Sequence, residues 1–206
     1  MNKHDAVLCV FTKTPVAGNV KTRLIPSLGE EGACELYQTL LTRTLETACS
    51  SEFTEIRLFC TPTTEHPFLR RCVENYAAQL FLQKGDDLGA RMNRALTDGL
   101  KEFSCAVVIG CDCPWLTLDD LEQAYRRLTI DKEVVLGPAS DGGYYLLGLS
   151  SPRPMLFENM SWGDSSVLNE TRRRLSKAGL SWSELTEHPD LDRPEDLIAY
   201  NQLVNS

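Results

Sequence analysis

The chain has 206 residues, a formal net charge of −8, 42% hydrophobic residues and 24% charged residues. This composition is typical of a soluble globular protein, and a chain of this length can bury roughly 70% of its extended surface without a disulfide or metal. The negative charge disfavours nucleic-acid binding, and no apolar run approaches the roughly 20 residues that span a bilayer. We expect a single domain over residues 1–206, located in the cytoplasm because the N-terminal sequence lacks signal-peptide architecture.

Short apolar runs rich in strand formers alternate with longer segments of helical spacing. Strands are predicted at 6–11, 55–60, 79–83, 105–110, 133–137 and 143–149. Helices are predicted at 30–49, at 66–77, from Asp86 or Asp87 to Leu100, from Thr117, at 164–178, and after Asp192-x-Pro194. This alternation predicts a three-layer α/β/α fold with a mostly parallel central sheet.

The segment after the first strand carries three cations around one glycine. Lys13, Lys21 and Arg23 are the cations, and Pro15 and Gly18 mark a turn. Ligands of parallel α/β sheets bind at the carboxyl ends of the strands, so this loop is predicted to hold phosphate oxygens. The spacing matches neither a Walker loop nor a dinucleotide fingerprint, and a solvated turn is the alternative. Arg91, on the helix after the third strand, is a further candidate for the same anion.

The clearest strand, 105–110, runs directly into Cys111, Asp112, Cys113 and Pro114. A carboxylate at this point suits Mg²⁺, which takes one or two carboxylates together with substrate phosphates. The two cysteines could instead belong to a zinc site, but the sequence offers no second ligand pair nearby. We expect all eight cysteines to be reduced. Asp112 could also be a helix cap, although Thr117, with Asp120 three residues later, is the better one.

Two later segments add candidates. Asp141-Gly142-Gly143 is a hairpin-turn signal, and its backbone could also approach a ligand closely while Asp141 holds ligand hydroxyls. Asp192 is either a helix cap or the second metal ligand beside Asp112. The basic run 172–174 on a predicted helix is interpreted as a solvated face rather than a nucleic-acid site.

A set of motifs in this order resembles a known bacterial family. The motifs are FTKTP (11–15), GNVKTRL (18–24), DLGxRM (87–92), GCDCP (110–114), GPAxDGGYYLLGL (137–149) and DxPEDL (192–197). They are similar to small predicted glycosyltransferases with a GT-A-type, Rossmann-like nucleotide-diphospho-sugar transferase fold. Some members are named arsenosugar-biosynthesis glycosyltransferases, and the family also resembles molybdenum-cofactor guanylyltransferases and lactate or phosphoenolpyruvate nucleotidylyltransferases.

The resemblance, which spans nearly the whole chain, implies a nucleotide facing Lys13, Gly18, Lys21 and Arg23. It implies metal ligation, by Mg²⁺ or Mn²⁺, at Asp112 and Asp192. Asp141, Gly142 and Gly143 would lie near the transferred sugar or the acceptor. Trp162 is a further candidate for that pocket, although the segment 161–167 and Cys111 depart from the family pattern. These departures concern the acceptor pocket more than the nucleotide site.

Two transferase reactions fit these residues. Glycosyl transfer from a nucleotide sugar to a small-molecule acceptor is favoured, because the first loop lacks the several backbone N–H groups that cradle a triphosphate. Nucleotidyl transfer from a nucleoside triphosphate to an acid or phosphate, with release of pyrophosphate, is the alternative. Asp141 is the best candidate base. A non-catalytic binding protein on the same fold is a third hypothesis, and the sequence leaves the oligomeric state open.

Overall fold

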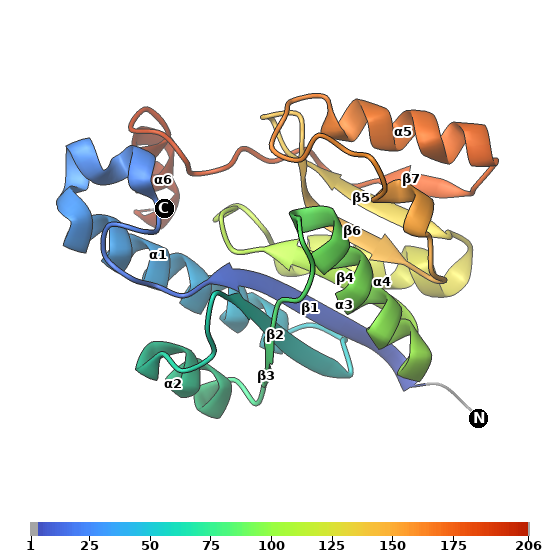
Figure 1. The fold of residues 1–206 in the computed structure, drawn as a ribbon, viewed down its shortest axis with the longest axis horizontal. Coiled ribbons are helices and arrows are strands. Elements are labelled where there is room, and N and C mark those ends of the chain that lie inside the picture. Colours follow the sequence, from blue (N-terminus) through green and yellow to red (C-terminus); the bar gives the residue numbers. More distant parts are fainter. Residues whose placement is uncertain (1–3, 206) are drawn as a thin grey trace.

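The computed structural model describes residues 4–205, and these residues form a seven-stranded mixed sheet between helical layers (Figure 1). The sheet order is β3-β2-β1-β4-β6-β5-β7. The strands are β1 (His4–Lys13), β2 (Glu55–Thr61), β3 (Gln79–Leu82), β4 (Phe103–Gly110), β5 (Val134–Pro138), β6 (Tyr144–Leu149) and β7 (Trp182–Glu184). The helices are α1 (Ile25–Cys49), α2 (Pro67–Asn75), α3 (Leu88–Glu102), α4 (Leu118–Ile130), α5 (Val167–Ala178) and α6 (Asp196–Val204). Two short 3₁₀ turns lie at Thr22–Leu24 and Pro154–Leu156. The predicted three-layer α/β/α class is confirmed.

Alternate residues of the central strands bury the two faces of the sheet. In β1, Leu8 and Val10 belong to the core cluster on the side of α1, α2 and α4, whereas Val7 and Cys9 belong to the cluster on the side of α3 and α5. Because side chains of a strand alternate between faces, a strand covered on both sides reads as a continuous apolar run. This is why the runs at 6–11 and 105–110 could be recognised in the sequence.

Strand β6 is the exception to the parallel arrangement, since it is antiparallel to both β4 and β5. The turn that reverses the chain between β5 and β6 contains Asp141, Gly142 and Gly143. Asp141 Oδ1 accepts a hydrogen bond from Gly143 N at 2.8 Å, which closes the turn. The hairpin turn predicted from Asp-Gly-Gly is therefore present. The short edge strand β7 was not predicted from the sequence.

Helix ends follow the predicted capping residues in two places. Asp87 Oδ1 accepts from Ala90 N at 2.7 Å at the start of α3. Thr117 and Asp120 form a reciprocal capping box at the start of α4, so Asp112 is not the cap of this helix. The helix predicted from residue 164 starts later, at Val167, because the Asp164 carboxylate accepts from Ser166 N in the preceding turn.

The arginine run on α5 is used for intramolecular ties. Arg172 makes two bonds to the Glu184 carboxylate on β7, at 2.6 and 2.8 Å. Arg174 donates to the carbonyls of Met155, Glu158 and Asn159. Arg173 binds Glu170 one turn earlier on the same helix. The interpretation as a solvated face thus describes Arg173 and not its two neighbours, which hold the helix to β7 and to the preceding loop.

The chain returns to the sheet through residues 185–192, which we call the C-terminal strap. Leu185 N donates to Leu136 O (2.8 Å), His188 N to Pro138 O (3.1 Å), and Leu191 N to Asp112 O (3.1 Å). The strap therefore crosses the carboxyl ends of β5 and β4. Helix α6 follows and lies beside α1 (Figure 1), and Tyr200 of α6 forms a small apolar cluster with Leu40 of α1 and Leu191 of the strap.

The start of α6 differs from the prediction. The helix begins at Asp196, two residues beyond Pro194, and the Asp196 carboxylate accepts from the backbone N of Asp192 and Arg193. Asp192 does not cap the helix, and its carboxylate forms an ion pair with Arg23 instead. None of the helices in the part of the chain that the structure describes has the length and apolarity needed to cross a membrane.

Candidate active site

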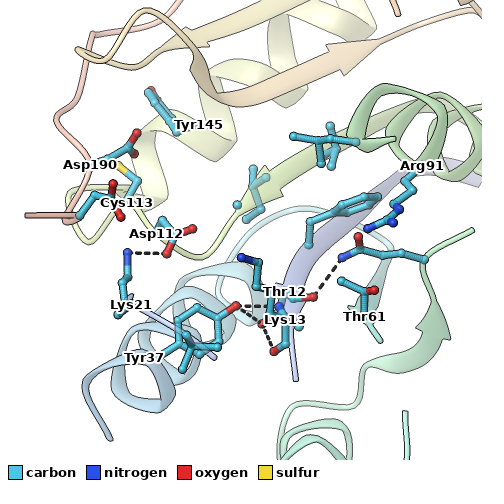
Figure 2. Close-up of a pocket in the computed structure, with 18 of the residues that line it drawn as sticks. Thr12, Lys13, Lys21, Tyr37, Thr61, Arg91, Asp112, Cys113, Tyr145 and Asp190 are labelled. Atoms are coloured by element: carbon cyan, nitrogen blue, oxygen red, sulfur yellow. Dashed lines mark hydrogen bonds and ion pairs between the residues drawn. The ribbon is translucent and has the colours of Figure 1, made fainter. Parts of the chain in front are cut away.

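The end of β1 is held by a tyrosine from α1. Tyr37 Oη accepts from Lys13 N at 2.7 Å and lies 2.8 Å from Thr12 Oγ1 (Figure 2). Tyr37 is buried, while the Lys13 side chain is exposed at the end of the strand. Among the described residues Lys13 has no carboxylate partner. The backbone of Lys13 is fixed and its ammonium group is free to meet an anion.

The turn after β1 depends on Gly18, whose φ of 81° lies in the left-handed region that favours glycine. A Cβ at this position would lie 3.4 Å from a carboxylate oxygen of Glu30, at the start of α1. Gly18 therefore brings the loop against α1. Pro15 is buried just before this turn. The structure places both residues behind the cationic loop, outside the lining of the cavity described below.

Asp112 lies just beyond the end of β4 and binds Lys21. The Lys21 Nζ atom is 2.5 Å from Asp112 Oδ1 (Figure 2) and donates to Leu191 O, also at 2.5 Å. The Lys21 side chain is only 3% exposed, whereas that of Asp112 is 55% exposed. Asp112 thus presents its second oxygen to solvent, while Lys21 is enclosed between β4 and the strap.

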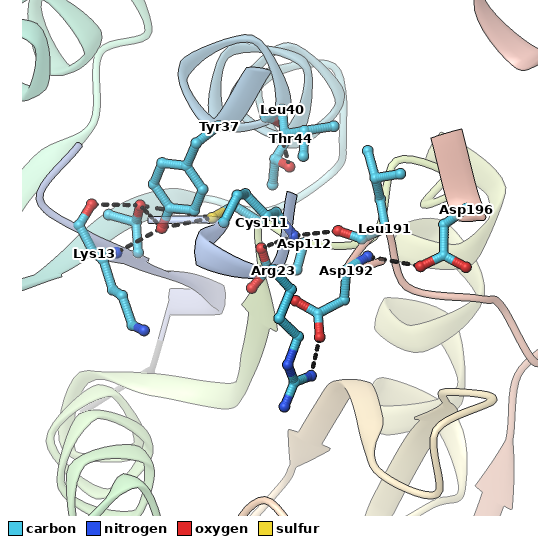
Figure 3. Close-up of polar contacts among 12 residues, drawn as sticks. Lys13, Arg23, Tyr37, Leu40, Thr44, Cys111, Asp112, Leu191, Asp192 and Asp196 are labelled. Atoms are coloured by element: carbon cyan, nitrogen blue, oxygen red, sulfur yellow. Dashed lines mark hydrogen bonds and ion pairs between the residues drawn. The ribbon is translucent and has the colours of Figure 1, made fainter. Parts of the chain in front are cut away.

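Asp192, at the end of the strap, forms an ion pair with Arg23 (Figure 3). Both side chains are partly solvent-exposed. Arg23 and Lys21 come from the same loop after β1, and their carboxylate partners come from β4 and the strap. The loop after β1 therefore supplies the cation of both ion pairs, and it also adds positive charge to the cavity that these residues line.

These elements surround a cavity of about 630 Å³ at the carboxyl edge of the sheet (Figure 2). Its charged lining consists of Lys13, Lys21, Arg23, Arg91, Asp112, Asp190 and Asp192. Its apolar lining includes Phe11, Leu88, Met92 and Tyr144. The Arg91 guanidinium is tied to the chain through Nε, which donates to Gly85 O at 3.0 Å, and no ion pair with a described carboxylate involves it. The structure thus gathers the predicted cations and the two predicted metal ligands in one place.

The turn 141–143 stands outside the lining of this cavity. Asp141 is exposed, and one of its oxygens is used within the turn. Gly142, with φ of 91°, packs against the loop before α5: a Cβ there would lie 2.1 Å from Ser165 O. Its CO accepts from Leu168 N at 2.9 Å. The close approach that needs a glycine at position 142 is therefore made by the protein's own backbone.

Trp162 packs beside the cavity and covers Gly89 at the start of α3. A Cβ on Gly89 would lie 2.3 Å from the indole nitrogen. The indole also meets the rings of Tyr144 and Phe157, with centroids 6.4 and 6.3 Å away. The buried indole N–H has no acceptor among the described residues. Trp162 reaches the cavity indirectly, by supporting Tyr144, which lines it.

Sequence reasoning did not single out two residues of the lining. Burial, together with the negative charges of Asp141 and Asp112, raises the pKa of Asp190 to about 7. Gln83 donates through its amide nitrogen to Thr12 O and Phe59 O, both at 3.0 Å. Asp190 could have been suggested by its place two residues before Asp192. Gln83 carries no comparable signal, because only the structure shows its amide closing the ends of β1 and β2.

The cysteines that flank Asp112 are buried thiols. Cys111 donates to Tyr37 Oη at 3.2 Å and to Thr12 Oγ1 at 3.6 Å. Burial raises the pKa of Cys111 and of Cys113 to about 12. All eight cysteines are free thiols, and no group of three or more metal-ligating side chains is found within residues 4–205. Cys49 is the exposed one.

We expect selective alkylation of the native protein by iodoacetamide at pH 8. Cys49 should be modified first, while Cys111 and Cys113 should stay unmodified, because a buried thiol with such a pKa supplies almost no thiolate. Peptide mass spectrometry identifies the labelled positions, and protein unfolded in urea, which should be labelled at all cysteines, is the control. Rapid labelling of Cys111 in the native protein would contradict this description.

Residues 44–164 match the model of a family described as "Uncharacterized protein conserved in bacteria (DUF2064)". The chain belongs to this family. The matched segment, more than half of the chain, runs from the second half of α1 to the loop before α5, and includes Asp112, Asp141 and Trp162. Among curated proteins, none matches this sequence.

Solved structures share the architecture of this family member. A candidate nucleotide-diphospho-sugar transferase from Desulfovibrio desulfuricans G20 is 26% identical, with a TM-score of 0.83 over 92% of this chain and 83% of that one. A nucleotidyl transferase from Methanothermobacter is 12% identical, with a TM-score of 0.67 over 98% and 97%. Glucosyl-3-phosphoglycerate synthase from Mycobacterium tuberculosis, in complex with Mn²⁺ and UDP, is 10% identical, with a TM-score of 0.59 over 96% and 75%. The last two likenesses show the fold alone. Together, the three support the nucleotide-diphospho-sugar transferase fold that the motifs suggested.

Proposed function

We propose that this protein is a metal-dependent transferase that uses a nucleotide-activated donor, and that it moves a sugar from a nucleotide sugar to a small-molecule acceptor. One observation carries the proposal: two cations without carboxylate partners, Lys13 and Arg91, line the same cavity as Asp112 and Asp192. A nucleoside diphosphate has the complementary pattern, since its phosphate oxygens suit the cations and a shared divalent cation suits the carboxylates. The apolar wall suits a base or a sugar ring.

The carboxylates fit Mg²⁺ or Mn²⁺. Asp112 and Asp192 each use one oxygen for an internal cation, and within residues 4–205 the other oxygen of each has no partner. Their side chains are 55% and 42% exposed, so both can be reached from the cavity. Two carboxylates that leave further positions to phosphate oxygens are the usual donor set for Mg²⁺. When bound, the divalent ion would neutralise charge on the leaving nucleoside diphosphate.

The chain's own residues would act around that charge. Lys13 and Arg91 bind phosphate oxygens and orient the donor, which lowers the barrier through fixed electrostatics. The acceptor oxygen forms a bond to the anomeric carbon as the bond from that carbon to the diphosphate oxygen breaks. Asp141 lies outside the cavity lining, but its charge acts on Asp190, which lines it, and the second oxygen of Asp141 has no partner among the described residues. Asp141 is the proposed base for the acceptor proton. The proposal keeps Trp162, Gly142 and Gly143 as the framework on the acceptor side.

Nucleotidyl transfer is the second candidate, because nucleotidyl transferases share the fold. In that reaction an acid or phosphate attacks the α-phosphorus of a nucleoside triphosphate, and pyrophosphate leaves. The loop after β1 argues for the diphosphate instead. Two of its three cations, Lys21 and Arg23, already carry carboxylate partners, which leaves less charge for a triphosphate.

A thermal-shift screen with Mg²⁺ or Mn²⁺ tests the proposal against nucleoside diphosphates, nucleoside triphosphates and nucleotide sugars. A ligand at about 100 times its Kd stabilises the native state by roughly 2.7 kcal/mol, an easily measured increase in Tm. We expect an increase with one nucleotide sugar that disappears in EDTA. An increase with a triphosphate alone would favour nucleotidyl transfer. No increase with any nucleotide would favour a non-catalytic protein.

A further inference from the structure

Lys21 differs from the other cations of its loop in backbone conformation and in burial. Its φ is 47°, in the left-handed region that residues other than glycine seldom adopt. Its side chain is 3% exposed, whereas Arg23, two residues later, is 65% exposed. Strained backbone at such a position persists only where the surrounding contacts require it. We therefore expect the contacts of the Lys21 ammonium group to explain its left-handed backbone conformation.

The ammonium group joins three segments that are distant in sequence. Lys21 comes from the loop after β1, Asp112 follows β4, and Leu191 belongs to the strap. Nζ lies 2.5 Å from Asp112 Oδ1 and donates to Leu191 O at 2.5 Å, while Leu191 N donates to Asp112 O at 3.1 Å. The three residues thus form a closed ring of contacts. An ammonium has three N–H donors, so two are already committed in a space almost closed to solvent.

These contacts argue against direct phosphate binding by Lys21. Asp112 and Leu191 O hold two of the three N–H donors of Lys21, and the side chain is 3% exposed, so at most one donor is left for an anion. If the ammonium group turned fully toward a phosphate, it would leave both partners, and the strap would lose a tie to the end of β4. Lys13 and Arg91 line the same cavity, and neither forms an ion pair with a described carboxylate. Unlike Lys21, they can therefore bind an anion without breaking an ion pair.

We propose that Lys21 is a positioning residue, which fixes Asp112 and the strap that carries Asp192 so that the two carboxylates can share one divalent cation with the donor's diphosphate. This inference rests on the proposed function and gives Lys21 a positioning role in place of the phosphate binding expected from the sequence. Lys13 and Arg91 remain the phosphate ligands. The strained backbone at Lys21 follows, because only an inward-turned side chain reaches both Asp112 and Leu191.

The test uses inorganic pyrophosphate as the probe, in the presence of EDTA or of Mn²⁺, with binding measured by calorimetry. Lys21→Met should leave pyrophosphate binding in EDTA within about twofold of the unmodified protein. It should lower the gain in affinity that Mn²⁺ brings by about 10–100-fold, the usual loss when a group that orients a metal ligand is removed. Lys13→Met should do the reverse: weaker binding in EDTA, by about tenfold or more, and an unchanged gain with Mn²⁺.

Arg57→Met is the control for lost stability, because Arg57 is another buried cation whose partners, Glu55 and Glu102, lie away from the cavity. It should lower Tm and leave both affinities unchanged. If Lys21→Met weakened binding in EDTA as much as Lys13→Met, Lys21 would be a phosphate ligand and the proposal would be wrong. A full gain with Mn²⁺ in Lys21→Met would also overturn it.

Hydrogen exchange separates this proposal from the proposed function. Peptides that cover the strap, 185–192, should exchange faster in Lys21→Met than in the unmodified protein without any ligand, and Lys13→Met should show no such change. Unchanged exchange would overturn the positioning role whatever the binding data show. Absence of pyrophosphate binding in the unmodified protein, together with faster exchange in Lys21→Met, would count against the proposed function and leave the structural tie in place.

Discussion

Replacement of Asp112 by asparagine is expected to abolish metal-dependent nucleotide binding while the protein stays folded. Asparagine keeps an oxygen that can accept from Lys21 Nζ, so the contact with the loop after β1 is retained in weaker form. The negative charge that would hold the divalent ion is lost. Even a residue that only supports a metal ligand typically costs 10–100-fold, so we expect a loss above about 100-fold for a direct ligand. Calorimetric titration with the nucleotide identified by thermal shift, with and without Mg²⁺, measures it.

Asp98→Asn is a suitable control for this experiment. Asp98 is partly exposed on α3, where it pairs with Lys101 and Arg94, and it does not line the cavity. It should leave the binding affinity unchanged and alter stability by less than about 1 kcal/mol, as expected for a surface ion pair. Retention of the full Mg²⁺ effect in Asp112→Asn would remove Asp112 from the metal site and, with it, the main support for the proposed mechanism.

Gly142→Ala is expected to give the largest loss of stability among single methyl additions in this region. The φ of 91° is strained for any side chain, and the new Cβ would lie 2.1 Å from Ser165 O, a backbone atom that cannot move alone. The turn 141–143 and the loop before α5 would have to separate, which would also strain the bond from Leu168 N to Gly142 O. We expect a loss of about 2–4 kcal/mol, and roughly 5–15 °C in Tm for a domain of this size.

Gly163→Ala is the matched control. Gly163 lies in the loop before α5 against which Gly142 packs, has a φ of 86°, and would have no atom within 4 Å of an added Cβ. It therefore carries the backbone strain without the collision and should cost about 1–2 kcal/mol. Denaturant unfolding of both variants gives the difference. Equal losses would show that the two segments can move apart freely, contrary to the packing that the structure has.

The sequence allowed most of the fold to be predicted because its signals are local. Buried parallel strands read as apolar runs, and Asp87, Thr117 and the Asp-Gly-Gly turn are capping and turn signals that act within a few residues. The prediction failed at the start of α6 for a related reason. Asp192 looks like a cap in sequence, but a residue 169 positions away, Arg23, takes its carboxylate, and Asp196 accepts from the backbone in its place.

The sequence indicated where the residues of the candidate site lie in the fold, but not which atoms their side chains contact. Strand ends indicated that Lys13, Arg91 and Asp112 would lie at one edge of the sheet, and all three line the same cavity. The inward direction of Lys21 depends on a left-handed backbone at a residue type that rarely adopts one, so no residue pattern indicates it. Likewise, the space that requires glycine at position 142 is filled by Ser165, a partner that only the three-dimensional arrangement of the two loops determines.

The strap carries two of the carboxylates that line the cavity, Asp190 and Asp192, so any local opening of the strap would change the candidate site. Backbone hydrogen bonds hold the strap at Leu185, His188 and Leu191, the side chains of Tyr145 and Lys21 donate to the carbonyls of Thr186 and Leu191, and His188 Nε2 lies 2.9 Å from Asp120 Oδ2. Local opening of such a segment would require these contacts to break together, without unfolding of the whole sheet. Each detachment would remove Asp190 and Asp192 from the cavity together and expose Lys21. A donor that needs Asp192 would bind only to molecules whose strap is closed, so its affinity would be lowered by the fraction of closed molecules.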